Sequence, residues 1–298
     1  MLLIKGKRSS GQLRPTAGKK RGLSKNLNKK ATFAKYQRLV EILKSFDGLL
    51  VAFSGGVDSS LLLKAAADSG AKVLAVTVDS PIYDRQEIRE ARQIASKLGV
   101  PFRLIKSDDY LREDFKKNDL LRCYHCKLAI FTRLREIARS EGLSAVVEGS
   151  NLDDERDYRP GRKALAELGI GSPLKEAGLG KAEIRFLARS FGLPNWDRPA
   201  NACLATRIPY GQPVELRWLE RIAAGETFLR KMGFSQVRLR HHGELARIEV
   251  WPNELALVIS QPSREKIVRR LKKLGWKYVA FDLEGYRTGS LNPGGLKT

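Results

Sequence analysis

A glycine-rich turn between an apolar run and a helical pattern constrains this chain more than any other feature. Residues 48–53 are almost all apolar, residues 54–60 read SGGVDSS, and residues 58–68 have helical periodicity. The first turn of a helix offers unpaired N–H groups and the positive end of its dipole, which together bind an anion. Gly55 and Gly56 let the backbone approach a phosphate without a clash from a Cβ atom. The segment therefore predicts a phosphate-binding loop.

The polar side chains of this loop extend the prediction to ATP. Ser54, Ser59 and Ser60 supply hydroxyl donors. Asp58 would repel phosphate unless a cation lay between them, so we predict that it binds Mg²⁺ or caps the helix. The loop lacks the Gly-Lys-Ser/Thr ending of a Walker A motif and resembles the signature of the ATP pyrophosphatase (PP-loop) superfamily. This resemblance implies cleavage of ATP between its α- and β-phosphates, with adenylation of an oxygen atom and release of pyrophosphate.

Apolar runs and helical patterns alternate on both sides of this loop. Apolar runs that are nearly continuous are typical of parallel strands buried on both faces, and their alternation with helices implies right-handed crossovers. The predicted fold is therefore α/β, a doubly wound parallel sheet of Rossmann-like type, while 149–180 reads mostly as loop. The expected strands are 48–53, 72–78, 102–105 and 145–148, and the expected helices are 34–46, 58–68, 85–98, 124–140 and 181–191.

After residue 213 the pattern changes to a smaller α+β unit. Two alternating runs, 236–240 and 245–251, predict a hairpin. Helices are expected at 214–232 and 264–274, with a last strand at 277–283. We therefore predict three parts: a basic tail (1–33), a PP-loop ATP pyrophosphatase domain (34–210) and a C-terminal domain (211–298) for substrate binding or oligomerisation.

The net charge of +22 is concentrated at the N-terminus, where residues 1–40 hold 12 Lys and Arg and no acid. Such a tail is expected to be disordered. A solubilising extension or a misassigned start is favoured over a nucleic-acid contact, and a transit peptide is a minor alternative. No apolar run reaches the roughly 20 residues of a membrane helix, and the start is too short for a secretory signal. A cytoplasmic protein without a membrane partner is predicted.

Two further segments are expected beside the nucleotide, because doubly wound sheets bind ligands at the carboxyl ends of their strands. Asp79 follows the second strand, where the superfamily holds the adenine. Gly149 begins the turn GSNLDD, which either touches the nucleotide or its Mg²⁺, or forms an Asx-turn and a helix cap.

Three cysteines form the second candidate site, and their small odd number argues against a disulfide framework. Cys123 and Cys126 form a C-x-x-C at the start of a helix, and Cys203 follows much later. Three thiolates could bind three irons of a [4Fe–4S] cluster and leave the fourth iron open. The alternatives are a Cys₃His zinc site with His125, a redox pair, or buried thiols.

These cysteines lie in motifs that resemble one family over residues 46–292. The motifs are SGGVDSS, RCYHCK, GSNLDDERDYRPG, SPL, ACLATRIPYG, VRLRHHGELARIEV and GYRTGS. The chain resembles the LarE family, the ATP-dependent sulfur transferases of nickel-pincer cofactor biosynthesis. The resemblance implies that ATP adenylates one carboxylate of a pyridinium mononucleotide, and that sulfur then displaces AMP to give a thiocarboxylate.

In this family Cys203 would be catalytic in one of two ways. It would surrender its own sulfur and become dehydroalanine, or it would bind a [4Fe–4S] cluster with Cys123 and Cys126, from which a sulfide is donated. The presence of all three cysteines favours the cluster, reloaded from sulfide or another sulfur donor. The resemblance also implies a homo-oligomer.

Four arginines match family positions around the phosphate or carboxylates of the substrate, which a guanidinium can bind in a bidentate manner. They are Arg207, Arg238, Arg240 and Arg287. Arg207 and Asp58 are also predicted to be catalytic residues. The alternative is that they are ordinary surface arginines.

Two rival functions remain at this point. A PP-loop tRNA thiolase with a [4Fe–4S] cluster would suit the positive charge, although much of that charge lies in the tail, so a nucleic-acid partner is not favoured. A nucleotide sensor without turnover is disfavoured by the intact Asp58 and the three cysteines.

Overall fold

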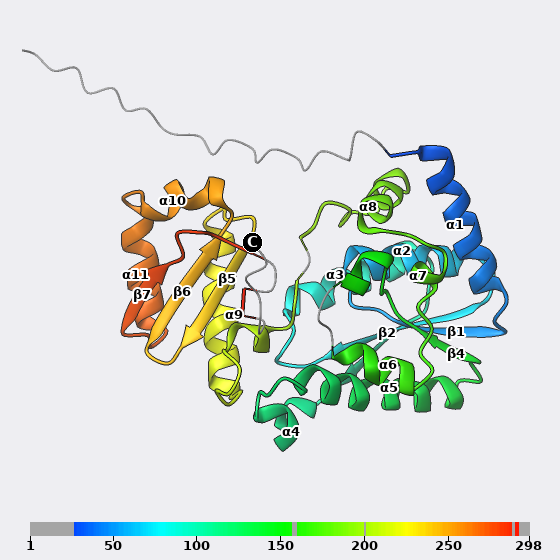
Figure 1. The fold of residues 1–298 in the computed structure, drawn as a ribbon, viewed down its shortest axis with the longest axis horizontal. Coiled ribbons are helices and arrows are strands. Elements are labelled where there is room, and N and C mark those ends of the chain that lie inside the picture. The colour runs from blue at the N-terminus through cyan, green and yellow to red at the C-terminus, as the bar shows by residue number, and fades with distance from the viewer. Residues whose placement is uncertain (1–26, 157–159, 200, 288–289, 292–298) are drawn as a thin grey trace, which may run out of the picture.

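The computed structural model describes residues 27–156, 160–199, 201–287 and 290–291. Its first part is a parallel sheet flanked by helices (Figure 1). The strands are β1 (Gly48–Ala52), β2 (Lys72–Asp79), β3 (Phe102–Lys106) and β4 (Ala145–Val147). The helices are α1 (Lys29–Lys44), α2 (Val57–Asp68), α3 (Arg85–Lys97), α4 (Glu113–Lys116), α5 (Arg122–Ser140), α6 (Gly161–Glu167), α7 (Pro173–Glu176) and α8 (Lys181–Ser190).

This sheet has the order β3-β2-β1-β4, and every pair is parallel. Alternate residues of β1 enter different cores: Leu49 and Val51 pack with α2 and α3, whereas Leu50 packs with α5. Figure 1 shows α2 and α8 on one side of the sheet and α5 and α6 on the other. The predicted doubly wound α/β fold is confirmed, and the carboxyl ends of β1 and β2 lie side by side.

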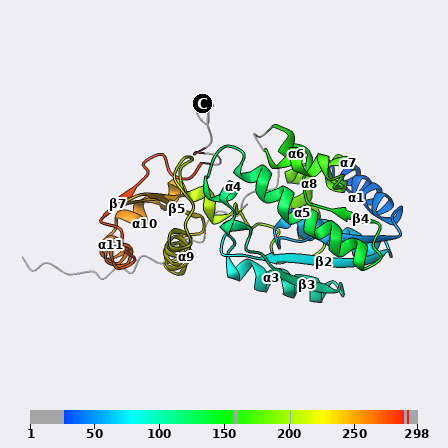
Figure 2. The ribbon, with the colours of Figure 1, turned by 90° about the horizontal axis from the view of Figure 1, so that it is seen from below.

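The second part is a three-stranded mixed sheet, which Figure 2 shows beside the first. Its hairpin, β5 (Val237–His242) and β6 (Leu245–Val250), is antiparallel as predicted, and β7 (Tyr278–Phe281) joins β6 in parallel. The accompanying helices are α9 (Leu216–Lys231), α10 (Leu255–Ile259) and α11 (Ser263–Lys273). Apolar residues of α9, α11 and the sheet form one core.

Several local expectations were wrong. The segment 149–180 is not mostly loop, because it contains a 3₁₀ helix (Leu152–Arg156), α6 and α7. These helices are too short for an apolar period to be recognised. Helix α1 begins at Lys29 rather than at 34, because the Asn28 side chain caps it by accepting a hydrogen bond from the Ala31 amide at 3.1 Å. Residues 1–26 of the predicted tail lie outside the described residues.

The core of the second part also receives side chains from the first. Ile82, Phe115 and Leu204 belong to the same buried cluster as Leu219 and Leu239. The two parts therefore share an apolar junction, and the boundary at 210 stays a prediction. Within the described residues, no helix combines the length and the apolar character needed to cross a bilayer.

His241 in β5 is a buried packing residue. Its ring stacks on Trp218 with a centroid distance of 4.2 Å, and its Nδ1 accepts a hydrogen bond from Trp276 Nε1 at 3.1 Å. Burial, followed by the charge of Arg221, lowers the pKa of His241 to about 4.

This histidine is expected to make folding stability sensitive to acid. Because its folded pKa lies below the unfolded value of about 6.5, the unfolded chain binds more protons as the pH falls. Stability is fully present above pH 6.5 and declines toward pH 4, with a loss of about 2 kcal/mol by pH 5. Urea unfolding at pH 7.5 and pH 5 measures this loss. His241→Asn keeps an acceptor for Trp276 and should show a smaller loss; an equal loss would contradict the assignment.

Candidate functional site

The predicted phosphate loop connects β1 to α2. Gly55 has a φ of +74°, and a Cβ there would lie 3.0 Å from Ala91 Cβ, so only glycine fits between the loop and α3. Gly56 is the N-cap of α2. The first helical hydrogen bond runs from the Ser60 amide to Gly56 O at 2.9 Å. The preceding amides at the start of α2 have no helical partner, as an anion site requires. The geometry agrees with the predicted loop.

The loop hydroxyls differ in their surroundings. Ser54 is exposed, and its Oγ lies 3.1 Å from Ser59 Oγ. Ser60 is fully buried, and its Oγ accepts a hydrogen bond from Asn195 Nδ2 at 2.9 Å; the same Nδ2 donates to Gly55 O at 2.8 Å. Ser60 therefore braces the loop from inside, whereas Ser54 is available to a ligand. Asn195 was missed, because it lies in a segment without periodicity far along the chain.

Asp58 is paired with a cation that sequence reasoning also missed. Lys181, the first residue of α8, donates from Nζ to Asp58 Oδ2. Burial raises the pKa of Asp58 and the nearby Asp154 raises it further, while Lys181 opposes the shift without cancelling it. Asp58 Oδ1 is buried and has no hydrogen-bond partner. This acceptor is suited to a cation, since Mg²⁺ is bound through one or two carboxylates together with substrate phosphates.

The turn after β4 lies against the phosphate loop. A Cβ on Gly149 would be 3.0 Å from the Ser59 amide nitrogen, so this glycine allows the two backbones to approach. Asn151 Oδ1 accepts from the Asp153 amide at 3.0 Å, and Asp153 Oδ2 accepts from the Lys181 amide at 2.6 Å. The alternative of an Asx-turn and a helix cap is therefore what the structure shows for Asn151 and Asp153.

The three cysteines are all free and half-buried. Cys126 and Cys203 pack against the junction core, and Cys123 is one residue into α5. Burial, and then Cys203, raise the pKa of the Cys126 thiol to about 12. Burial also raises the pKa of Cys203, which Arg122 opposes and Cys123 reinforces. The charges of Cys203 and Cys123 thus act on Cys126, which places the three thiols in one neighbourhood, here called the three-cysteine site. Their binding of a common cluster stays a prediction.

Arg122 is a buried cation in this three-cysteine site. It is 2% exposed, and its Nη1 donates to Ala205 O at 3.1 Å and to Asn118 Oδ1. Its Nη2 lies 3.9 Å from Cys123 Sγ. Arg122 thus links the start of α5 to the segment that follows Cys203. The basic residue next to Cys123 in the RCYHCK motif could have indicated a cation beside the thiols. Its contact with Ala205, far along the chain, could not be predicted from the sequence.

Arg207 does not lie open to a substrate. Its side chain and that of Glu226 are both 0% exposed, and Nε donates to Glu226 Oε1 at 2.8 Å. The remaining N–H groups donate to acceptors in the Cys203 segment and to Glu226, namely Ala202 O, Cys203 O, Thr206 Oγ1, Asn201 Oδ1 and Glu226 Oε2. In this arrangement Arg207 supports the Cys203 segment, and its direct contact with substrate stays a prediction.

The other predicted arginines also differ in their environment. Arg240 is buried and pairs with Glu249 at 2.8 Å, and its Nη1 donates to Thr206 O at 2.9 Å. Burial, and then the charge of Arg207, lower the pKa of Arg238 to about 10. Arg287 is partly exposed and pairs with Glu284. The structure brings Arg207, Arg238 and Arg240 together, but mostly as buried, compensated charges.

Among the described residues, no group of three or more His, Cys, Asp or Glu side chains is placed to hold a single metal ion. His125 Nδ1 lies 3.8 Å from Asp114 Oδ2, and the zinc alternative stays a prediction. A [4Fe–4S] cluster is larger than one ion, so its thiolate ligands lie farther apart. Three thiols with a buried guanidinium 3.9 Å from Cys123 Sγ fit a cluster in donor chemistry.

Comparison with known proteins places the chain in a family. Residues 48–125 match the family model for the queuosine biosynthesis protein QueC. An uncharacterized protein of Synechocystis sp. is 37% identical over 87% of this chain and 97% of its own length. The tRNA-specific 2-thiouridylase MnmA of Zymomonas mobilis is 30% identical, but over only 36% of this chain and 34% of its own length.

The pyridinium-3,5-bisthiocarboxylic acid mononucleotide synthase of Lactiplantibacillus plantarum is 38% identical over 88% of this chain and 95% of its own length. The match extends over nearly the full length of both proteins, so it is not confined to the nucleotide-binding part. The chain therefore belongs to the family of this synthase, the LarE family.

Proposed function

We propose that the protein activates a carboxylate of pyridinium-3,5-biscarboxylic acid mononucleotide with ATP and replaces AMP by sulfur, in nickel-pincer cofactor biosynthesis. The observation that carries this proposal is the similarity to a pyridinium-3,5-bisthiocarboxylic acid mononucleotide synthase over nearly its whole length. The phosphate loop and the three-thiol site supply the chemistry that the two half-reactions need. The tRNA thiolase alternative has less support, because the similarity to such enzymes is lower or shorter: 30% identity over 36% of this chain in one case and 26% identity over 60% of it in another.

In the first half-reaction, the pyrophosphate part of ATP lies at the start of α2. Ser54 and the unpaired amides donate to it, and Lys181 compensates part of its charge. Asp58, whose Oδ1 has no hydrogen-bond partner, would hold a Mg²⁺ ion that supplies further positive charge. A carboxylate oxygen of the acceptor attacks the α-phosphorus, the bond from that phosphorus to the bridging oxygen breaks, and pyrophosphate leaves. The product is an acyl adenylate. It is a much better electrophile than the carboxylate.

In the second half-reaction, a sulfur nucleophile attacks the acyl carbon, the bond to the AMP oxygen breaks, and AMP leaves. A [4Fe–4S] cluster bound by Cys123, Cys126 and Cys203 would supply an open iron that carries the donated sulfide. The protein's own residues hold this site in place: Arg207 binds the carbonyl of Cys203, and Arg122 joins α5 to the same segment. We also propose that the protein works in the cytoplasm as a homo-oligomer.

The reaction is tested with protein purified without oxygen and analysed for iron and sulfide. Incubation with ATP, Mg²⁺, the mononucleotide and sulfide should release AMP and pyrophosphate and give a product with one oxygen replaced by sulfur, detected by mass spectrometry. Sulfur incorporation into tRNA, with none into the mononucleotide, would support the thiolase instead.

Loss of Arg122 is expected to weaken the metal site. Arg122→Met removes the buried cation and leaves Ala205 O and Asn118 Oδ1 without a donor, so stability should fall by about 2–3 kcal/mol. Residues that orient metal ligands typically change metal affinity about 10–100-fold. Iron retention against a chelator, measured on folded protein, reports this effect. Arg103→Met, which breaks a surface pair with Glu141, serves as the control; equal iron retention in both variants would refute the role of Arg122.

A further inference from the structure

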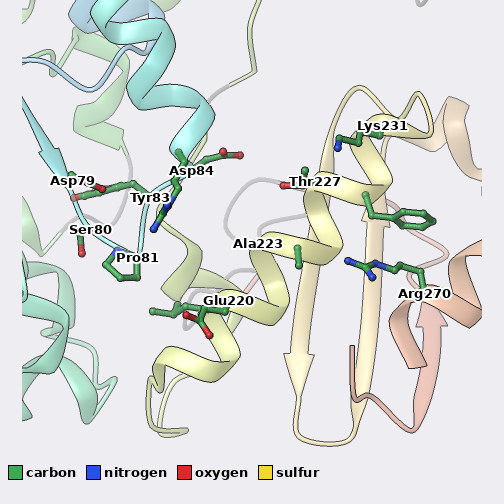
Figure 3. Close-up of a pocket in the computed structure, with 14 residues that line it drawn as sticks. Asp79, Ser80, Pro81, Tyr83, Asp84, Glu220, Ala223, Thr227, Lys231 and Arg270 are labelled. Atoms are coloured by element: carbon green, nitrogen blue, oxygen red, sulfur yellow. The ribbon is translucent and has the colours of Figure 1, made fainter. Parts of the chain in front are cut away.

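A cavity of about 650 Å³ lies between the end of β2 and one side of α9 (Figure 3). One wall is the turn from Asp79 to Arg85. The other wall runs along α9 from Glu220 to Lys231 and is completed by Arg270 of α11. Among the lining residues, Asp79 was predicted from the sequence to lie near the nucleotide.

The basic side chains of this cavity are unpaired as far as the described residues show. Arg85, Lys231 and Arg270 make no side-chain ion pair or hydrogen bond within the described part of the chain. Arg270 is half-buried, so its unpaired charge is only partly hydrated. In contrast, Arg207 and Arg240 are saturated by Glu226 and Glu249. Three cations that line this cavity are therefore open to an anionic ligand, whereas Arg207 and Arg240 already have internal partners.

Ser80 gives a second, independent indication of a ligand. This residue lines the cavity and is 4% exposed, yet its Oγ has no hydrogen-bond partner. A buried hydroxyl without a partner costs free energy, which a polar ligand atom would recover. Ser80 directly follows β2, the neighbour of the strand that leads into the phosphate loop.

The same cavity reaches toward the three-cysteine site. Tyr83 lines it and packs against the junction core that also contacts Cys126 and Cys203. The preceding residue, Ile82, accepts a hydrogen bond through its carbonyl from the Leu204 amide at 2.8 Å. The cavity therefore lies between the nucleotide end of the sheet and the thiols. An acceptor that is first adenylated and then attacked by sulfur must occupy such a position.

The cavity is lined by both acidic and basic side chains. Asp79, Asp84 and Glu220 are acidic, and Asp84 is already paired with Arg230. Arg85 lies on the same turn as Asp79, whereas Lys231 and Arg270 lie farther along α9 and on α11 (Figure 3). Tyr83 supplies an aromatic ring, whose face attracts a cation. A pyridinium mononucleotide has the matching properties: a flat cationic ring and an anionic phosphate.

We propose that this cavity is the acceptor site, with the ring of a pyridinium mononucleotide near Tyr83 and its phosphate bound by Lys231 and Arg270. The proposal rests on the function proposed above, and it assigns the phosphate contact to cations other than the arginines expected from the family motifs. Ser80 donates to a polar atom of the same ligand.

The test compares pyridinium-3,5-dicarboxylate mononucleotide with its dephosphorylated nucleoside, using the full-length protein. In Lys231→Ala/Arg270→Ala, KM for the mononucleotide should rise about tenfold or more, because two charge-assisted contacts are lost. KM for the nucleoside and for ATP should stay within about twofold. The control is Arg269→Ala/Lys273→Ala, which removes two exposed cations of α11 that do not line the cavity.

An unchanged KM for the mononucleotide, or an equal rise for the nucleoside, would overturn the site. Direct titration of the mononucleotide onto the protein without ATP separates this failure from a failure of the proposed reaction. Binding that needs Lys231 and Arg270 without any turnover would retain the site and reject the reaction. Binding that is indifferent to both residues would reject the site itself.

Discussion

Cys203→Ser is expected to release pyrophosphate in the presence of the acceptor but to form no thiocarboxylate. Adenylation takes place at the phosphate loop, which the substitution does not touch. Sulfur transfer should fall by more than about 10³-fold, the scale on which removal of an essential reactive group acts. The two half-reactions are measured separately, by pyrophosphate release in the first turnover and by mass spectrometry of the product.

The loss in this variant would be chemical rather than structural. The Cys203 segment is held through its backbone: the Cys203 carbonyl accepts hydrogen bonds from Arg207 Nη1 at 3.1 Å and from the Thr206 amide at 3.0 Å. A serine keeps both bonds, so the unfolding midpoint should hardly change. Full sulfur transfer by Cys203→Ser would eliminate both proposed sulfur routes.

Cys123→Ser and Cys126→Ser decide between those routes. If the three thiolates act together on a cluster, each variant should lose iron and sulfur transfer as Cys203→Ser does. If Cys203 gives up its own sulfur, both variants should complete one turnover, and the protein should lose the mass of one H₂S as a thiol becomes dehydroalanine. The mass of the intact protein after turnover distinguishes the two.

The features of the fold that depend on local sequence patterns were predicted from the sequence. The apolar runs predicted the parallel strands, and the Ser54–Ser60 pattern predicted the loop. In the structure Gly55 of this loop has a positive φ. The short helices within 149–180 were missed, because α7 has only four residues and so shows no apolar period. The parallel pairing of β7 was not predicted either, since nothing local specifies the partner of a strand.

The site was predicted less completely than the fold. Whether a side chain is buried, paired or open to a ligand depends on residues that are far away in the sequence. Arg207 looked like a substrate ligand, and only the position of Glu226 on α9 turns it into a buried ion pair. Asn195 and Lys181 contact the phosphate loop from the far end of the same part. A basic residue at the start of a helix that follows a glycine was a visible signal for Lys181, but it could not be tied to Asp58 from sequence alone.

Lys181→Ala is expected to slow adenylation about 10²-fold or more and to raise KM for ATP. The variant removes a cation at the start of α8 and leaves Asp58 close to the phosphates without its partner. Groups that stabilise developing negative charge in a protected site contribute on this scale. The measurement is pyrophosphate release over a range of ATP concentrations at saturating Mg²⁺. Lys181→Arg, which keeps the charge, should recover part of the rate.

Two further variants separate the charge of Lys181 from its packing. Lys35→Ala breaks the 2.8 Å pair between α1 and Glu183 on the same helix as Lys181, and it should leave adenylation within about twofold, as expected for a half-exposed surface pair. The double variant Asp58→Asn/Lys181→Ala removes the repulsion between the unpaired Asp58 and the phosphates of ATP, so KM for ATP should be partly restored. The maximal rate should stay low, because the carboxylate for Mg²⁺ is missing. If Lys181→Ala behaved like Lys35→Ala, Lys181 would be a structural partner of Asp58 without a role in binding ATP.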